Sequence, residues 1–191
     1  MTSFTCTRTT RLARLGVTLF VACAGWAAAA AQTPASPQAP VPPRLVLALE
    51  AHVQLGTPVE VGEVARGRRR IIPIVGGTFE GSGIKGKVLN SGADWQVIRA
   101  DGFAELDTRY ALQTDKGQII YVQNAGMRHA APEVMQKLLA GEIVDPKLVY
   151  FRTVPTFETS APELQWLTRS IFVGTGERYP TEVVIRFWKL E

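Results

Sequence analysis

The chain has few of the residues that build reactive or cross-linked sites. It contains two cysteines, Cys6 and Cys23, and both fall within residues 1–31. The remaining sequence can therefore form no disulfide, thiolate metal site or cysteine nucleophile. The two histidines, His52 and His129, lie in no nucleophile-elbow string, which argues against a serine triad. A two-histidine metal site would require these residues to meet, and we expect no metal and no cofactor.

Excess charge of one sign is also scarce. The chain carries 21 basic and 17 acidic residues, a formal net charge of +4. Three of the basic residues and none of the acidic ones lie in residues 1–31, so the remainder carries 18 minus 17, or +1. A domain this close to neutrality argues against nucleic acid as a partner.

No apolar run is long enough to make a good membrane span. Leu15–Trp26 is apolar but short and rich in alanine. With arginines before it and alanines after it, the segment predicts a signal peptide over residues 1–31, cleaved after Ala31. We expect a periplasmic or secreted protein with no stable membrane insertion after cleavage. Lipoprotein processing at Cys23 is disfavoured, because Phe20 suits the lipobox position poorly.

The composition changes twice along the chain. Residues 32–43 are rich in proline and alanine, which predicts an extended linker. Residues 44–191 then form one segment without an internal repeat. A chain of this length suits a single domain that buries about two-thirds of its unfolded surface.

Short alternating runs separated by glycine turns dominate residues 44–191. Arg68–Gln96 predicts three strands, and Leu45–Val53 alternates so that its odd-numbered positions form one apolar face. Gly76-Gly77 suggests a bulge or bend within this pattern. The spacing of strands and turns favours an all-β fold, a single antiparallel β-barrel of about nine or ten strands. Closure would remove apolar edges that the sequence otherwise exposes.

Three segments between the strands need their own interpretation. Pro132–Leu139 predicts one short helix, with proline in its first turn, that plugs or caps a barrel end. Asn124–His129 is expected to be a loop, and Gly174–Gly176 to lie in the turn of a closing hairpin. Gly81–Gly86 matches a G-x-G-x-x-G spacing, but a strand follows it, so we interpret its glycines as hairpin turns.

Several strings together resemble a known family, namely RRRIIPIVGGTFEG, GADWQ, LDTRYALQTDKGQIIYVQNAG, YFRTVPTFET and WLTRSIFVGTGER. They resemble the domain of unknown function 3237 family, also called uncharacterised protein family 0311. The resemblance runs from about Leu45 to the C-terminus. It implies a single antiparallel β-barrel domain, in agreement with the pattern of strands. It implies no established activity.

Polar residues on the expected strands are candidates for a site at the barrel mouth. Charges that point into a small barrel must pair, bind ligand or meet water. We take Asp94 as the candidate catalytic base, and the candidate ligand-binding residues are Arg109, Tyr110, Tyr121, Asn124, Arg128, Tyr150, Arg152, Glu158 and Trp166. The hypothesis is a small-molecule ligand, aromatic or carboxylate-bearing, held by arginine and aromatic side chains. Arg152 and Tyr110 would orient it for cofactor-free isomerase or lyase chemistry.

The competing hypothesis is a non-catalytic binding or interaction module whose barrel is filled by its own side chains. In that case the charged candidates form buried ion pairs, such as Arg152 with Glu158 or Asp94. Internal volume discriminates the two hypotheses, since a packed core leaves no room for a ligand. A homodimer is compatible with either.

Overall fold

The computed structural model describes residues 41–191. The predicted signal peptide, residues 1–31, and all but the last three residues of the predicted linker, 32–43, lie outside the described residues and stay predictions. Within residues 41–191, no helix is both long and apolar enough to cross a membrane.

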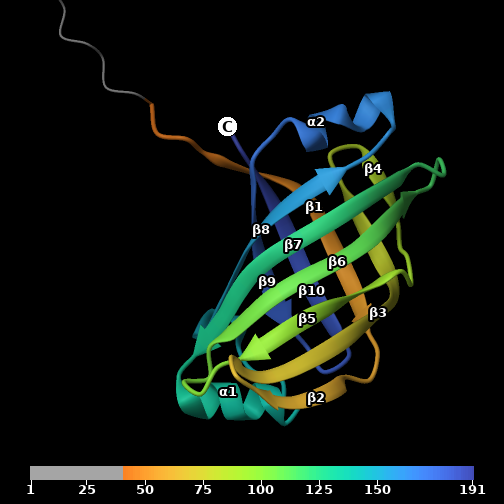
Figure 1. Ribbon diagram of the computed structural model, residues 1–191. Coiled ribbons are helices and arrows are strands. Elements are labelled where there is room, and N and C mark those ends of the chain that lie inside the picture. Colours follow the sequence, from red (N-terminus) through yellow and green to blue (C-terminus); the bar gives the residue numbers. More distant parts are fainter. Residues whose placement is uncertain (1–40) are drawn as a thin grey trace, which may run out of the picture. The chain divides into compact units, whose positions relative to one another are not determined.

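The sheet closes on itself at β1 (Leu45–Leu55). This strand pairs antiparallel with β10 (Glu182–Leu190) on one edge and with β3 (Gly67–Gly81) on the other. From β10 the ring continues through β9 (Phe172–Arg178), β8 (Val149–Glu158), β7 (Ile119–Ala130), β6 (Ala104–Thr114) and β5 (Gly92–Ile98), which returns to β3. The predicted antiparallel barrel is confirmed (Figure 1).

Two further strands extend this ring. β2 (Val59–Val64) forms a hairpin with the first residues of β3. β4 (Ile84–Val88) follows the glycine turn after β3 and pairs with both β3 and β6. The G-x-G-x-x-G spacing thus belongs to a β-hairpin, as interpreted from the sequence.

The helices lie at opposite ends of the barrel (Figure 1). The predicted helix is confirmed as α1 (Pro132–Leu139), at the same end as β2. α2 (Gln165–Thr168) lies at the other end, and short 3₁₀ turns occur at Pro146–Leu148 and Pro162–Leu164.

The apolar face of β1 is shorter than the sequence pattern predicts. A register shift between Leu47 and Leu49 in the pairing with β10 interrupts the alternation. Leu47 is consequently 45% exposed, whereas Leu49 and Ala51 are fully buried. A β-bulge inserts an extra residue and turns the preceding side chains to the other face.

Two predicted connections are strands instead. The expected loop at Asn124–His129 is part of β7, and the expected turn at Gly174–Gly176 is part of β9. Glycine is used there for close packing: a Cβ on Gly126 would lie 2.4 Å from the backbone oxygen of Arg152. A Cβ on Gly174 would lie 2.0 Å from the Thr153 hydroxyl oxygen. These glycines let β7, β8 and β9 approach one another.

The two ends of the barrel domain are tied together. The backbone N–H of Arg44 donates to the carbonyl of Glu191 at 2.7 Å, and the N–H of Glu191 donates back at 2.8 Å. This pair extends the β1–β10 ladder beyond Leu45 and Leu190, at the end of the barrel that carries α2 (Figure 1).

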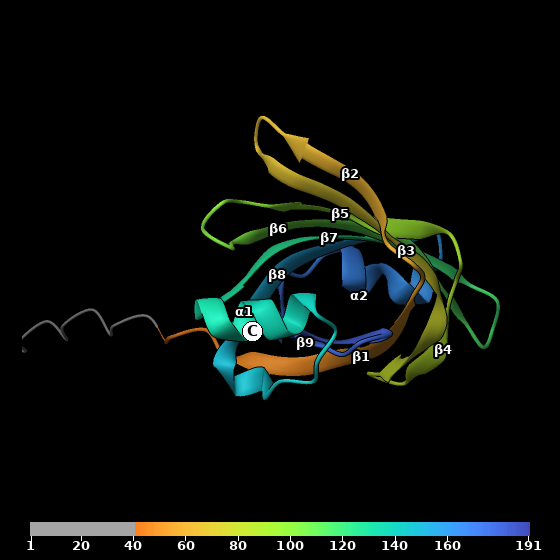
Figure 2. The ribbon, with the colours of Figure 1, turned by 90° about the horizontal axis from the view of Figure 1, so that it is seen from below.

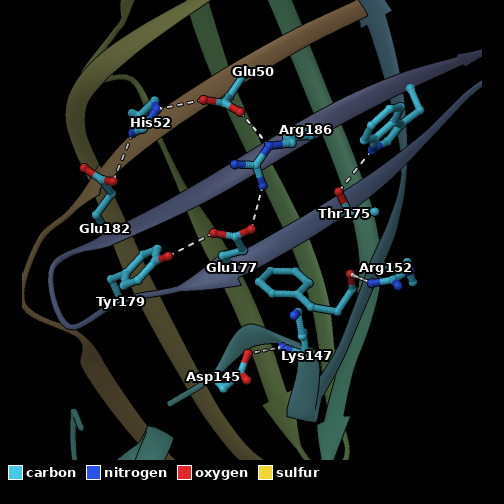
Figure 3. A network of polar contacts seen from close by, with 12 residues as sticks. Glu50, His52, Asp145, Lys147, Arg152, Thr175, Glu177, Tyr179, Glu182 and Arg186 are labelled. Atoms are coloured by element: carbon cyan, nitrogen blue, oxygen red, sulfur yellow. Dashed lines mark hydrogen bonds and ion pairs between the residues drawn. The ribbon is translucent and has the colours of Figure 1, made fainter. Parts of the chain in front are cut away.

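A chain of polar side chains ties β1 to β9 and β10 on the outer surface (Figure 3). His52 lies between Glu182 and Glu50, with 3.1 Å from a ring nitrogen to an oxygen of each. Arg186 contacts Glu50 at 2.5 Å and Glu177 at 2.6 Å. The hydrogen bond to Glu182 raises the pKa of His52, partly offset by burial and reinforced by Glu50.

Gly77 should tolerate substitution much less well than Gly83. Both have left-handed φ angles, +131° and +76°. A Cβ on Gly77 would lie 1.9 Å from the backbone oxygen of His52, whereas one on Gly83 would meet nothing within 4 Å. We expect Gly77→Ala to lower the free energy of unfolding by about 2–4 kcal/mol and Gly83→Ala by about 1 kcal/mol. Urea unfolding measures both, and equal losses would contradict the close approach of β3 to β1.

His52 should stabilise the protein more at acid than at alkaline pH. Its pKa is raised on folding, so its contribution is complete below the unfolded pKa of about 6.5 and is lost as pH rises through the folded pKa. Because the side chain is 45% exposed, we expect an effect below about 1 kcal/mol. Thermal unfolding of wild type and His52→Gln from pH 5.5 to 8.5 tests it. A difference that grows toward alkaline pH would show that the sign is wrong.

Candidate functional site

The barrel interior has an apolar half on the side of α2. Phe157 meets Phe172 and Phe187 edge to face, with ring centroids 5.1 and 5.4 Å apart. Leu164 and Leu167, from the helical turns over this end, are almost completely buried. Side chains therefore fill this half of the barrel, as the non-catalytic hypothesis expects for the whole interior.

The other half, toward α1 and β2, contains a chamber, and Figure 2 views the barrel from this end. Its free space is about 500 Å³ counted out to the mouth, of which about 40 Å³ can hold the centre of a water-sized sphere. That is room for about three waters. The polar side chains of the wall are Asp94, Gln96, Thr108, Tyr110, Asn124, Arg128, Thr153 and Arg178.

Six atoms of this wall are buried and lack a hydrogen-bond partner among residues 41–191. They are Asp94 Oδ1, Gln96 Oε1, Tyr110 OH, Asn124 Oδ1, Arg128 Nε and Thr153 Oγ1. An unsatisfied buried polar group costs about 1–3 kcal/mol. Such groups gathered in one chamber indicate a wall that binds water or ligand rather than a packed core.

Asp94 is the carboxyl of the chamber wall. It lies on β5, where Gln96 Nε2 donates to its Oδ2 at 2.5 Å. Burial raises the pKa of Asp94, opposed by hydrogen bonds from Gln96 and Thr108 and by the charge of Arg128. The raised pKa extends the pH range in which the carboxyl stays neutral, and such a group can donate a proton when neutral and accept one when ionised.

Tyr110 on β6 and Arg128 on β7 line the same chamber as Asp94. Burial raises the pKa of Tyr110, so its hydroxyl stays neutral and available as a donor. Burial also lowers the pKa of Arg128 to about 10, although the charge of Asp94 works against this effect. Arg128 is only 4% exposed, and its guanidinium carbon lies 5.8 Å from the centroid of the Phe151 ring.

The candidate residues from the sequence divide into two groups. Asp94, Tyr110, Asn124 and Arg128 come together on the chamber wall. Five others lie on the outer surface of β6, β7 and β8, namely Arg109, Tyr121, Tyr150, Arg152 and Glu158. Trp166 lies on α2 at the filled end, its ring 6.1 Å from that of Phe172.

The outer position of Arg152 separates it from the partners expected for it. Its Nη1 donates to the backbone oxygen of Phe151 at 2.8 Å, and its guanidinium carbon lies 5.1 Å from the Tyr150 ring centroid. It forms no salt bridge with Glu158 or Asp94 in the part of the chain that the structure describes. The proposed pair of Arg152 and Tyr110 as orienting residues is therefore wrong, since the two lie on opposite faces of the barrel wall.

The sequence interpretation missed four polar residues of the wall, which are Gln96, Thr108, Thr153 and Arg178. Arg178 was missed because Gly174–Gly176 was interpreted as a turn. The alternation Phe172, Gly174, Gly176, Arg178 continues along β9 and would have placed it inside.

Neither histidine lies on the chamber wall. His129 stacks between Phe103 and Tyr150 on the outer surface, with ring centroids 5.6 and 4.9 Å away. His52 lies in the outer polar chain described above. Among residues 41–191, no group of three or more histidine, cysteine or acidic side chains is placed to hold a metal ion.

Comparison with known proteins gives consistent matches over the barrel domain. A family model described as "Protein of unknown function (DUF3237)" matches residues 43–190. A UPF0311 protein from Rhodopseudomonas palustris strain TIE-1 is 51% identical over 132 residues, covering 69% of this chain and 86% of the relative.

Solved structures share the fold. The crystal structure of the conserved protein of unknown function RPA1785 from Rhodopseudomonas palustris has a TM-score of 0.77 at 42% identity and covers 80% of this chain and all of its own. An enzyme from Penicillium herquei has a TM-score of 0.60 at 21% identity, covering 82% of this chain and all of its own. At that identity the likeness extends to the fold alone.

Replacing Asp94 by asparagine should change how stability depends on pH. Because the folded pKa of Asp94 is raised, the folded state binds more protons than the unfolded state above about pH 4, and stability falls as pH rises through the folded pKa. Asp94→Asn removes this loss, so its advantage over wild type should grow from pH 4 to pH 8. Thermal unfolding across that range measures it. Asp107→Asn, whose side chain is 45% exposed on the outer face of β6, controls for the loss of one charge. An advantage that shrinks with rising pH would contradict the burial argument.

Proposed function

The chain belongs to the DUF3237 family of proteins of unknown function, and we propose that its chamber binds a small organic molecule, aromatic or carboxylate-bearing. The observation that carries this proposal is the set of six unpartnered polar atoms on one buried wall. A ligand with matching donors and acceptors would satisfy them, while the apolar part of the wall takes its hydrocarbon body.

We propose further that the chamber performs cofactor-free acid–base chemistry of the isomerase or lyase type. Asp94 would give and take the proton, since its raised pKa brings the neutral and ionised forms closer to working pH. The Tyr110 hydroxyl and the Asn124 side-chain oxygen, both buried on the wall, would orient the reacting group.

The alternative function is non-catalytic binding. The solidly filled half of the barrel supports it, as does a resting chamber with room for about three waters. Both functions use the same wall, and they differ only in whether the bound molecule is converted. We also propose export to the periplasm or outside the cell, on the sequence of residues 1–31.

Native mass spectrometry of the protein purified from its source, without added ligand, tests the binding proposal. We expect a retained small molecule whose mass identifies its chemical class. If none is retained, and thermal-shift screening with aromatic and aliphatic acids and their neutral analogues shows no binder, the proposed binding function is wrong.

Matched variants test catalysis. Incubated with the retained molecule, Asp94→Asn should bind it within about threefold of wild type but convert it about 10²–10⁴-fold more slowly. Glu158→Gln, on the outer surface of β8, should convert it at the wild-type rate. Conversion by Asp94→Asn at the wild-type rate would exclude Asp94 as the base, and no conversion by the wild type would leave non-catalytic binding as the function.

A further inference from the structure

Three arginines from three separate strands approach the chamber, namely Arg70 on β3, Arg128 on β7 and Arg178 on β9. They are near enough to influence one another. Burial lowers the pKa of Arg178, and the charge of Arg70 lowers it further. Burial likewise lowers the pKa of Arg128, to about 10, with smaller contributions from Arg178 and Arg70.

The acidic groups nearby do not balance these charges. Arg70 has its own partner, since its Nε lies 2.7 Å from Glu60 Oε1. Among residues 41–191, neither Arg128 nor Arg178 has a carboxylate oxygen within 4 Å. Asp94 is the acid of the chamber wall, and burial favours its neutral form. Two cations therefore face at most one anion.

An excess of buried positive charge is costly. A desolvated charge without a partner destabilises the folded state, and an incoming anion removes much of that cost. The same charges in water would attract an anion only weakly, because solvent screens them. The positive charge on this wall thus favours binding of an anionic ligand.

The free donors of these arginines suit a carboxylate. Arg128 Nε is buried and has no partner among residues 41–191, and Arg178 Nη1 donates to the backbone oxygen of Glu182 at 3.3 Å. A guanidinium offers five N–H donors in a planar fork that fits the two oxygens of a carboxylate. Most N–H donors of the Arg128 and Arg178 guanidinium groups therefore remain available to a ligand.

The rest of the chamber wall suits the apolar part of a ligand. Ile72, Ile74 and Phe151 line the same chamber. The Phe151 ring lies against Gly176, where a Cβ would approach it to 2.6 Å. A glycine at this position leaves room for the ring beside Arg128, so the aromatic surface lies next to the cationic one.

We propose that the ligand is an organic monoanion whose carboxylate lies between Arg128 and Arg178 while its apolar body packs against Phe151. This inference rests on the proposed function, because it names the class of molecule that the same chamber binds. Arg128 and Arg178 are binding residues in it. Asp94, on the same chamber wall, is left for proton transfer.

The test compares acids with their uncharged amides of nearly equal shape. The probes are benzoate with benzamide, 3-phenylpropanoate with 3-phenylpropanamide, and butanoate with butanamide, each titrated by calorimetry at low and at high salt. Charge-assisted hydrogen bonds predict that at least one acid binds about tenfold or more tighter than its amide. Inorganic phosphate is titrated as an anion without an apolar body.

Variants assign the preference to residues. Arg178→Gln should reduce the ratio of acid to amide affinity to about threefold or less, and so should Arg128→Gln if it folds. Arg178 is less buried than Arg128, so its variant keeps the test valid if Arg128→Gln unfolds. Arg152→Gln, on the outer face of β8, should keep the wild-type ratio. Circular dichroism confirms folding of each variant.

The outcomes separate the two claims. Amides that bind as tightly as their acids, or an acid preference that survives Arg178→Gln, would overturn the monoanion site while the binding function stands. Binding of phosphate without binding of any organic acid would also overturn the organic class. If no probe binds and the purified protein retains no molecule, the proposed function falls and the inference with it.

Discussion

The structure depends on the pairing of β1 with both β10 and β3. With both edges of β1 paired, the ring of strands from β1 through β10 to β3 is closed, and its circumference is fixed. Alternate residues of each strand must then point into an interior that is only wide enough for side chains. The size and polarity of those inward residues decide whether side chains fill a given layer of the barrel or leave a cavity.

The inward-pointing residues differ between the two halves of the interior. Around Phe157, Phe172 and Phe187 the inward residues are large and apolar, and α2 covers that end. Around Asp94 and Arg128 they are polar and incompletely paired. The filled half and the closed backbone ladder stabilise the fold, which offsets the cost of unpaired polar groups in the other half.

Local alternation predicted much of the fold and part of the site. It predicted β1 and the antiparallel barrel, while the proline of the first turn helped to locate α1. The strands at Asn124–His129 and Gly174–Gly176 were missed because their glycines serve contacts with Arg152 and Thr153, which a local pattern does not contain.

Arg152 was misplaced for a different reason. Its polarity suggested a ligand contact, although its neighbours Phe151 and Thr153 belong to the face that the barrel buries. In a closed barrel of this size, the apolar face of a strand identifies the inward direction better than the chemistry of any single polar residue.

The hydrogen-bonded pair of Arg44 and Glu191 places both ends of the domain at the α2 end, away from the chamber mouth (Figure 1). A tether, tag or surface anchor joined to either end of the domain would thus attach at the end opposite the chamber. The same arrangement allows the domain to be immobilised on a support through its α2 end, with the chamber end directed away from the support.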